Sequence, residues 1–146
     1  MVSLRSFLKA KSYTKIKLKL TKTNHFEMRA CINGAEGRFI LDTGASNTCI
    51  GIDKVDAFKL QFETSEIKAA GAGAIDMETF ISPDNTIAIG KWKKKKQKIV
   101  LFDLVHVNQA LIQHETEPVD GIIGADLLKK GKAVIDYNKK VLYLKK

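Results

Sequence analysis

The chain has 146 residues, the length of one domain that can bury a core of its own. No stretch approaches the roughly twenty apolar residues that cross a bilayer, and Arg5 and Lys9 interrupt the first ten residues, where a signal peptide would carry its hydrophobic core. Cys31 and Cys49 are too few for a disulfide framework, so we expect both to be reduced and buried and the protein to be cytoplasmic, with no membrane partner. The formal net charge of +9 leaves nucleic-acid binding open.

The N-terminal segment leads into a predicted strand. Residues 1–13 are expected to form an extension, in which residues 6–8 either make a short helix or lie disordered. The domain is expected to cover residues 14–146. Over residues 16–20, isoleucine and leucine alternate with lysine, which is the period-two pattern of a half-exposed strand.

A hairpin is predicted next. Residues 25–32 and residues 37–42 both have strand character, and Asn33 and Gly34 between them favour the tight turn that joins antiparallel strands. The second strand of this hairpin runs directly into Asp42.

Residues 39–46 (FILDTGAS) present that aspartate in a tight turn after an apolar strand. Gly44 permits a sharp reversal that brings backbone N–H groups close to the Asp42 carboxylate, and Thr43 and Ser46 add hydroxyl groups nearby. This pattern is typical of a catalytic carboxylate. The alternative is an ordinary turn, because Asp-Thr-Gly is a three-residue match and aspartate and glycine are common turn residues.

The middle of the chain contains a predicted glycine-centred hairpin. Residues 53–60 suggest a short helix or turn, and residues 67–70 and 74–81 suggest two arms around Gly71-Ala72-Gly73. Such a hairpin could close as a flap over a neighbouring site. The alternative is an ordinary surface loop.

A lysine-rich run follows. Residues 86–90 and 98–104 are predicted strands, and residues 91–98, which include Trp92 and Lys93 to Lys96, are interpreted as a solvated turn that discourages edge-to-edge association. Nucleic-acid binding is the less favoured alternative, and a preference for acidic substrates or partners is a more modest consequence. Residues 107–113 could form a short helix or an irregular connection.

A second apolar segment runs into a glycine. Residues 120–128 (DGIIGADLL) place two isoleucines before Gly124 and a helical signal after it. That signal is expected to form a helical turn over residues 127–130, ended by Gly131. The last predicted hairpin pairs residues 134–137 with residues 141–144.

The segments around Asp42 and Gly124, in this order, resemble the active-site strand and the later hydrophobic-hydrophobic-glycine strand of retropepsin-like aspartic peptidases. The resemblance covers residues 14–145. It implies a mainly β, single-lobe acid-protease barrel with a flap hairpin and one or two short helices. The hairpin at the end of the chain looks more similar to bacterial members and to the retropepsin domain of DNA-damage-inducible proteins than to viral enzymes.

The number of aspartate motifs predicts the assembly. This chemistry needs two carboxylates that share a proton, and the chain has one Asp-Thr-Gly and no repeat that could supply another. The chain is also too short for a two-lobed aspartic peptidase. We therefore expect a twofold homodimer in which each copy contributes Asp42, acting as an endopeptidase on extended peptides or unfolded proteins. The rival hypothesis is a catalytically weak dimer that binds peptides or a partner.

The resemblance assigns roles to particular residues. The expected catalytic residues are Asp42, Thr43 and Gly44, with Thr43 bonding across the dimer. The expected supporting residues are Ala45, Ser46 and Gly124. The expected flap residues are Ala70, Gly71, Ala72 and Gly73. No cofactor is expected, and no metal either, because His25, His106 and His114 show no ligand spacing with the cysteines.

Overall fold

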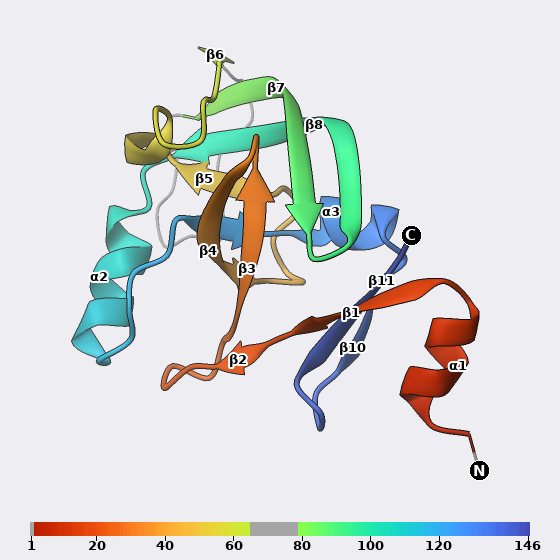
Figure 1. Cartoon of the computed structure of the whole chain (residues 1–146). Coiled ribbons are helices and arrows are strands. Elements are labelled where there is room, and N and C mark those ends of the chain that lie inside the picture. The colour runs from red at the N-terminus through yellow and green to blue at the C-terminus, as the bar shows by residue number, and fades with distance from the viewer. Residues whose placement is uncertain (1, 65–78) are drawn as a thin grey trace.

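The computed structural model describes residues 2–64 and 79–146 (Figure 1). Within these ranges the strands are β1 (Tyr13–Lys17), β2 (Lys19–Leu20), β3 (Phe26–Ile32), β4 (Ala35–Leu41), β5 (Cys49–Gly51), β6 (Glu63–Thr64), β7 (Phe80–Ile89), β8 (Trp92–Phe102), β9 (Gly121–Ile123), β10 (Val134–Asp136) and β11 (Val141–Lys145). The helices are α1 (Leu4–Ala10), α2 (Val105–Gln113) and α3 (Ala125–Lys130), with a 3-10 turn η1 (Ile52–Lys54). The protein is mainly β, as the sequence predicts.

Six of the strands close into a barrel. The hydrogen-bonded order of the larger sheet is β2-β3-β4-β9-β5-β8-β7-β6. β3 also pairs with β7, through Cys31 with Ala88 and Ile32 with Ile87. This extra pairing joins β3, β4, β9, β5, β8 and β7 into a ring and leaves β2 and β6 as extensions. Closure satisfies strand edges that would otherwise be free to pair with other chains.

The hairpin predicted at Asn33 and Gly34 is confirmed. β3 and β4 pair antiparallel around these two residues, whose φ angles are +52° and +88°. A tight hairpin turn needs positive φ at both central positions, and asparagine and glycine adopt it with little strain. The Asn33 side chain also donates to Asn85 Oδ1 and to the carbonyl oxygen of Phe58, both at 2.9 Å, so the turn is tied to β7.

The core fills the inside of this barrel. Its least exposed side chains come mostly from alternate positions of the barrel strands, and each has 2% or less of its surface exposed. These side chains are Ile32, Phe39, Ile50, Ile87, Ile99, Leu101 and Ile123. Burying each of them contributes about 1.5–3 kcal/mol before conformational entropy is counted. Leu20 departs from the predicted alternation, because it is 43% exposed in the short strand β2.

β9 lies between β4 and β5 and positions the candidate site. It runs parallel to β4, with Phe39 opposite Gly121 and Leu41 opposite Ile123, and antiparallel to β5. A Cβ atom at Gly121 would clash with the carbonyl oxygen of Cys49, so the three strands can approach this closely only with glycine there. The ends of β4 and β9 therefore emerge side by side.

A smaller sheet, in the order β1-β11-β10, holds the two ends of the chain (Figure 1). The predicted hairpin between residues 134–137 and 141–144 is confirmed as β10 and β11. Residues 6–8 lie in α1, so the helical alternative holds for them. Leu8 of α1 is 5% exposed and packs against Val141 and Tyr143.

The predicted turn at residues 91–98 is wrong. Trp92 to Lys98 lie within β8, and the reversal is confined to Gly90, with φ +56°, and Lys91. Trp92 is 1% exposed and anchors the beginning of the strand in the core, while Lys93 to Lys96 are exposed. Burial at the ends of the segment, rather than its average polarity, therefore decides its structure. Residues 80–81 and 86–89, which the sequence places in separate strands, belong to the single strand β7.

The segment expected to form the flap is described at its ends. β6 pairs antiparallel with β7, with Glu63 opposite Ile81 and Thr64 opposite Phe80. Residues 67–78, which include Ala70, Gly71, Ala72 and Gly73, lie outside the described residues. Residues 107–113 are helical in α2, and residues 53–60 combine η1 with turns.

Candidate active site

Asp42 follows β4 directly and is held in a turn by backbone hydrogen bonds. Its N–H donates to the carbonyl oxygen of Ile123 at 3.0 Å, so β9 continues to pair with the chain through this position. The N–H of Ala45 donates to the carbonyl oxygen of Asp42 at 3.2 Å and closes the turn. The N–H of Gly44 donates to Asp42 Oδ1 at 2.9 Å. One carboxylate oxygen therefore has a fixed direction, and the predicted approach of backbone N–H groups to the carboxylate is present.

Gly44 allows this approach mainly through its lack of a side chain. A Cβ atom there would lie 3.3 Å from Asp42 Oδ1, which is a tight contact. Glycine at this position keeps the carboxylate oxygen clear for the hydrogen bond from its own N–H.

Gly124 lies against the same turn from the β9 side. A Cβ atom at Gly124 would lie 2.8 Å from the carbonyl oxygens of both Ala45 and Asn47. The next residue, Ala125, donates its N–H to the carbonyl oxygen of Ala45 at 2.7 Å. The structure thus brings together the two motifs that are about eighty residues apart in the sequence.

Thr48 and Asp126 form a buried link that the sequence analysis missed. The Thr48 side chain is fully buried, and its hydroxyl donates to Asp126 Oδ1 at 2.8 Å and accepts from the N–H of Gly124 at 3.1 Å. Asp126 Oδ1 also accepts from the N–H of Leu127 at 2.8 Å, at the start of α3. The sequence features that could have indicated this link are a threonine just before β5 and an acidic residue two positions after Gly124.

Cys49 lies beneath the turn. Its thiol donates to the carbonyl oxygen of Asn47 at 3.2 Å, and its side chain packs with Val100, Phe102 and Ile122. Burial, together with the charges of Asp126 and Asp42, raises the pKa of Cys49 to about 12. The thiol is therefore protonated at neutral pH. Cys31 is also a free cysteine but is only partly buried, so the predicted burial holds for Cys49 alone.

A cavity of about 670 Å³ opens beside Asp42. Ile40 of β4 and Ile122 of β9 form part of its wall, and α2 lines another part through Val107, Ala110 and Leu111. The rest of the lining is polar and consists of Lys22, Thr23, Asn24, His25, His106 and His114. The His25 ring is oriented by a 2.7 Å hydrogen bond between Nδ1 and Thr23 Oγ1. All three histidines of the chain therefore meet in one cavity with the candidate catalytic aspartate.

The remaining predicted site residues lie in the same turn. Thr43 and Ser46 are exposed, and neither side chain makes a hydrogen bond to another of the described residues. Ala45 is partly buried against the cluster around Cys49. Among residues 2–64 and 79–146, no three histidine, cysteine or acidic side chains are grouped so as to hold a metal ion. No helix in this part of the chain is long and apolar enough to cross a membrane.

Comparison with known proteins identifies the family. A sequence model described as aspartyl protease matches residues 28–127, which include both Asp42 and Gly124. The chain therefore belongs to the aspartyl protease family. A comparison with curated proteins found no significant match to the sequence.

Solved structures share the fold. A retropepsin-like aspartic protease from Rickettsia conorii is 21% identical, with a TM-score of 0.57 and 90% of each chain covered. The EIAV protease, solved with an inhibitor, is 21% identical with a TM-score of 0.55, over 75% of this chain and 90% of that one. The retroviral protease-like domain of Ddi1 from Leishmania major is 15% identical with a TM-score of 0.57, over 86% and 90%. The fold is thus that of retropepsin-like proteins, as the sequence resemblance implied.

Proposed function

We propose that this protein is an aspartic endopeptidase that acts as a homodimer, with one Asp42 from each copy in the active site. The observation that carries the proposal is the position of Asp42 in a turn fixed by Ile123, Gly44 and Ala45, next to a cavity that could receive a substrate side chain. Membership of the aspartyl protease family supports a reaction at peptide bonds.

One chain supplies half of the required chemistry. An aspartic peptidase activates water between two carboxylates that share one proton, because two charged carboxylates so close together repel each other. One carboxylate takes a proton from the water as it attacks the peptide carbonyl, and the protonated partner donates to the carbonyl oxygen. Gly44 N–H holds Asp42 Oδ1, which leaves Oδ2 for the water and the partner carboxylate.

Thr43 is exposed and follows Asp42 directly in the turn. In a dimer, the turns of the two copies would face each other. In the proposed dimer the Thr43 hydroxyl bonds to the opposite turn and keeps the two carboxylates in register. Ala45, Ser46 and Gly124 would support the turn from behind, and residues 70–73 would close over the substrate as a flap.

The cavity beside Asp42 suggests how a substrate is held. An extended peptide would pair through its backbone and place a side chain next to the scissile bond into the cavity. The apolar wall at Ile40, Ile122 and Leu111 suits an aliphatic or aromatic stem. The polar rim, which includes His25, His106 and His114, suits a polar group at the end of that stem.

The decisive test compares the wild type with Asp42→Asn on an unstructured protein substrate. Asparagine is nearly the same size but cannot act as the base, so cleavage should fall by several orders of magnitude while the fold persists. Asp84→Asn is the matched control, because Asp84 is exposed and its side chain makes no hydrogen bond to another described residue. Equal cleavage by wild type and Asp42→Asn would remove Asp42 from the mechanism. A properly folded wild-type dimer that binds peptides without cutting them would favour the binding-module hypothesis.

A further inference from the structure

Positive charge is concentrated in three segments of the chain. Residues 1–26, 85–102 and 128–146 contain 20 of the 25 lysines and arginines but one of the 16 acidic residues. The rest of the chain, which includes Asp42, is therefore acidic. A division of this kind creates a positive field over any surface where the three segments meet.

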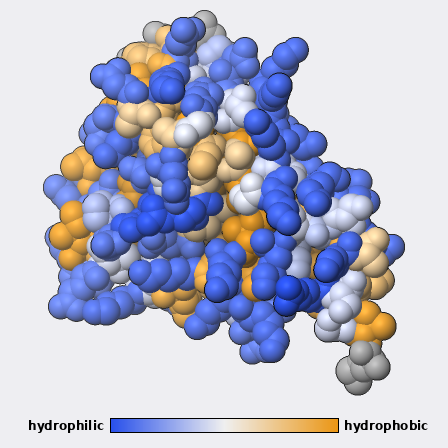
Figure 2. All heavy atoms as spheres, viewed as in Figure 1, coloured by the Kyte–Doolittle hydropathy of each residue, from blue (hydrophilic) through white to orange (hydrophobic). Residues whose placement is uncertain are grey.

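The fold brings the three segments together. β1 from the first segment pairs along its full length with β11 from the third. The second segment packs against the first through Gly90, in the turn between β7 and β8, and against the third through Trp92, at the start of β8. A Cβ atom at Gly90 would lie 3.4 Å from Ile16 Cγ1, and one at Gly131 would lie 3.4 Å from Trp92 Nε1. Hydrophilic residues dominate the molecular face drawn in Figure 2, which has the same orientation as Figure 1.

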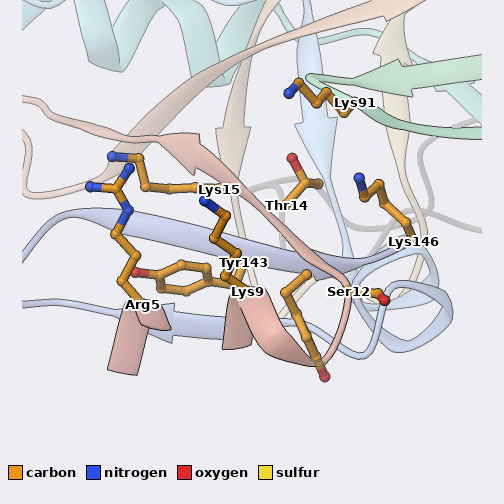
Figure 3. Close-up of a pocket in the computed structure, with 9 residues that line it drawn as sticks. Arg5, Lys9, Ser12, Thr14, Lys15, Lys91, Tyr143 and Lys146 are labelled. Atoms are coloured by element: carbon orange, nitrogen blue, oxygen red, sulfur yellow. The ribbon is translucent and has the colours of Figure 1, made fainter. Parts of the chain in front are cut away.

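A cavity of about 490 Å³ lies where these segments meet. Five cationic side chains line it, namely Arg5, Lys9, Lys15, Lys91 and Lys146. In Figure 3, Arg5 and Lys9 extend from α1 toward β1, where Lys15 lies, and Lys91 and Lys146 lie on the other side of Thr14. Among the residues that the structure describes, no acidic side chain lines the cavity, and none is shared with the cavity beside Asp42.

The polar groups of this cavity have few partners of their own. None of the five cationic groups lies within 4.0 Å of a carboxylate oxygen of another described residue. Thr14 and Tyr143 are 8% and 4% exposed, and within the described part of the chain neither hydroxyl makes a hydrogen bond. Like charges gathered without counter-charges destabilise a folded protein. The arrangement thus costs stability unless an anion occupies it.

We propose that this cavity binds an oligophosphate group, either free or as part of a nucleotide. Lysine, arginine and hydroxyl side chains are the usual donors to phosphate oxygens, and arginine can bind two of them at once. The volume is within the usual range of about 300–1,000 Å³ for small-molecule sites.

The density of charge favours phosphate over an acidic peptide. Successive side chains of an extended peptide point to opposite faces, so about every second carboxylate, spaced by roughly 6.6 Å, would reach the cavity. Each unit of an oligophosphate carries charge and accepts hydrogen bonds on all sides. It can therefore contact Arg5 and Lys9 on one side and Lys91 and Lys146 on the other within one compact ligand.

The test measures binding of inorganic tripolyphosphate to the full chain by calorimetry, at an ionic strength of about 0.15 M so that distant charges are screened. ATP and tri-glutamate serve as comparison ligands. The proposal predicts saturable binding of tripolyphosphate with one site per chain and weaker binding of tri-glutamate by at least about tenfold. ATP binding as well as tripolyphosphate would identify the nucleotide as a source of the group, and ATP failing to bind would restrict the site to free oligophosphate.

Two double variants with the same change in net charge show whether tripolyphosphate binding depends on the cavity residues or only on the net charge of the protein. Arg5→Gln with Lys15→Gln removes two cavity cations, and both side chains are exposed, so the fold should persist. Lys93→Gln with Lys94→Gln removes two exposed cations of β8 that do not line the cavity. The first variant should bind tripolyphosphate at least about tenfold more weakly, and the second within about twofold of wild type. Equal weakening in both variants, equal binding of tri-glutamate, or no saturable binding by wild type would each overturn the proposal. Peptide cleavage should be unchanged in both variants.

Discussion

Gly124 packs against the Asp42 turn so closely that a Cβ atom on it would lie 2.8 Å from the carbonyl oxygen of Ala45. The N–H of Ala125 donates to that same oxygen at 2.7 Å. Any side chain at position 124 would therefore separate the two strands that hold the site. This contact couples the stability of the fold directly to the geometry of the candidate catalytic turn.

The first prediction follows from that contact. Gly124→Ala should lower the free energy of unfolding by about 1–3 kcal/mol or more, because the added methyl group meets backbone atoms that cannot move aside. Gly44→Ala is the comparison, since its Cβ would lie 3.3 Å from a single side-chain oxygen rather than 2.8 Å from backbone atoms. Urea unfolding of both variants measures the difference. A loss in Gly44→Ala as large as that in Gly124→Ala would contradict this explanation.

The second prediction concerns the buried hydroxyl of Thr48. Thr48→Val keeps the shape but leaves the Gly124 N–H and an Asp126 oxygen without this partner, at a cost of about 1–3 kcal/mol. Thr48→Ser keeps the hydroxyl and should recover much of that loss. Chemical denaturation checks the stability, and the same preparations checked for cleavage would show whether the Asp42 turn is disturbed. Serine and valine variants of equal stability would show that the hydroxyl contributes nothing.

The third prediction uses the raised pKa of Cys49. In the unfolded chain the thiol ionises near its usual pKa of about 8.5, whereas burial and the charges of Asp126 and Asp42 raise the folded pKa to about 12. Between these values the folded state keeps a proton that the unfolded state has released, so stability is present below this window and is lost as pH rises through it. The loss contributed by this thiol approaches about 1.4 kcal/mol per pH unit.

Cys49→Ala removes this contribution but leaves the other titrating groups in place. Unfolding free energies of wild type and variant, measured from about pH 8 to about pH 10.5, should therefore converge as pH rises. Parallel curves would show that the Cys49 thiol does not titrate differently in the two states.

The fourth prediction tests the proposed dimer. Activity per mole should fall on dilution, with the same midpoint as dissociation measured by sedimentation, because each copy holds one of the two required carboxylates. Thr43→Val should raise the dissociation constant, since it removes a hydroxyl that would be buried between copies at a cost of about 1–3 kcal/mol. Thr86→Val makes the same substitution in β7, outside the Asp42 turn, and should leave the midpoint nearly unchanged. Full activity from a species that sediments as a monomer would contradict the proposed mechanism.

Local sequence was enough to predict features that depend on neighbouring residues. Asn33-Gly34 favours a hairpin because those two residues tolerate positive φ, and the apolar strand before Asp42 followed by Gly44 gives the turn and its N–H contact. The lysine run of β8 was predicted wrongly for a related reason. Its local polarity suggests a turn, but the strand is set by pairing with β7 and by burial of Trp92.

Contacts between distant segments were decided by the tertiary structure. Thr48 meets Asp126 because β9 inserts between β4 and β5, and His25, His106 and His114 share a cavity because α2 packs near the turn before β3. Lys15 of β1, Lys91 of the turn before β8 and Lys146 after β11 likewise line one cavity through strand pairing and packing. The sequence by itself determined the turns, the strands beside them and the residue types available for chemistry, because short-range sterics and hydrogen bonding govern these. The grouping of side chains into a site arises only when long-range strand pairing and core packing place separate segments against one another.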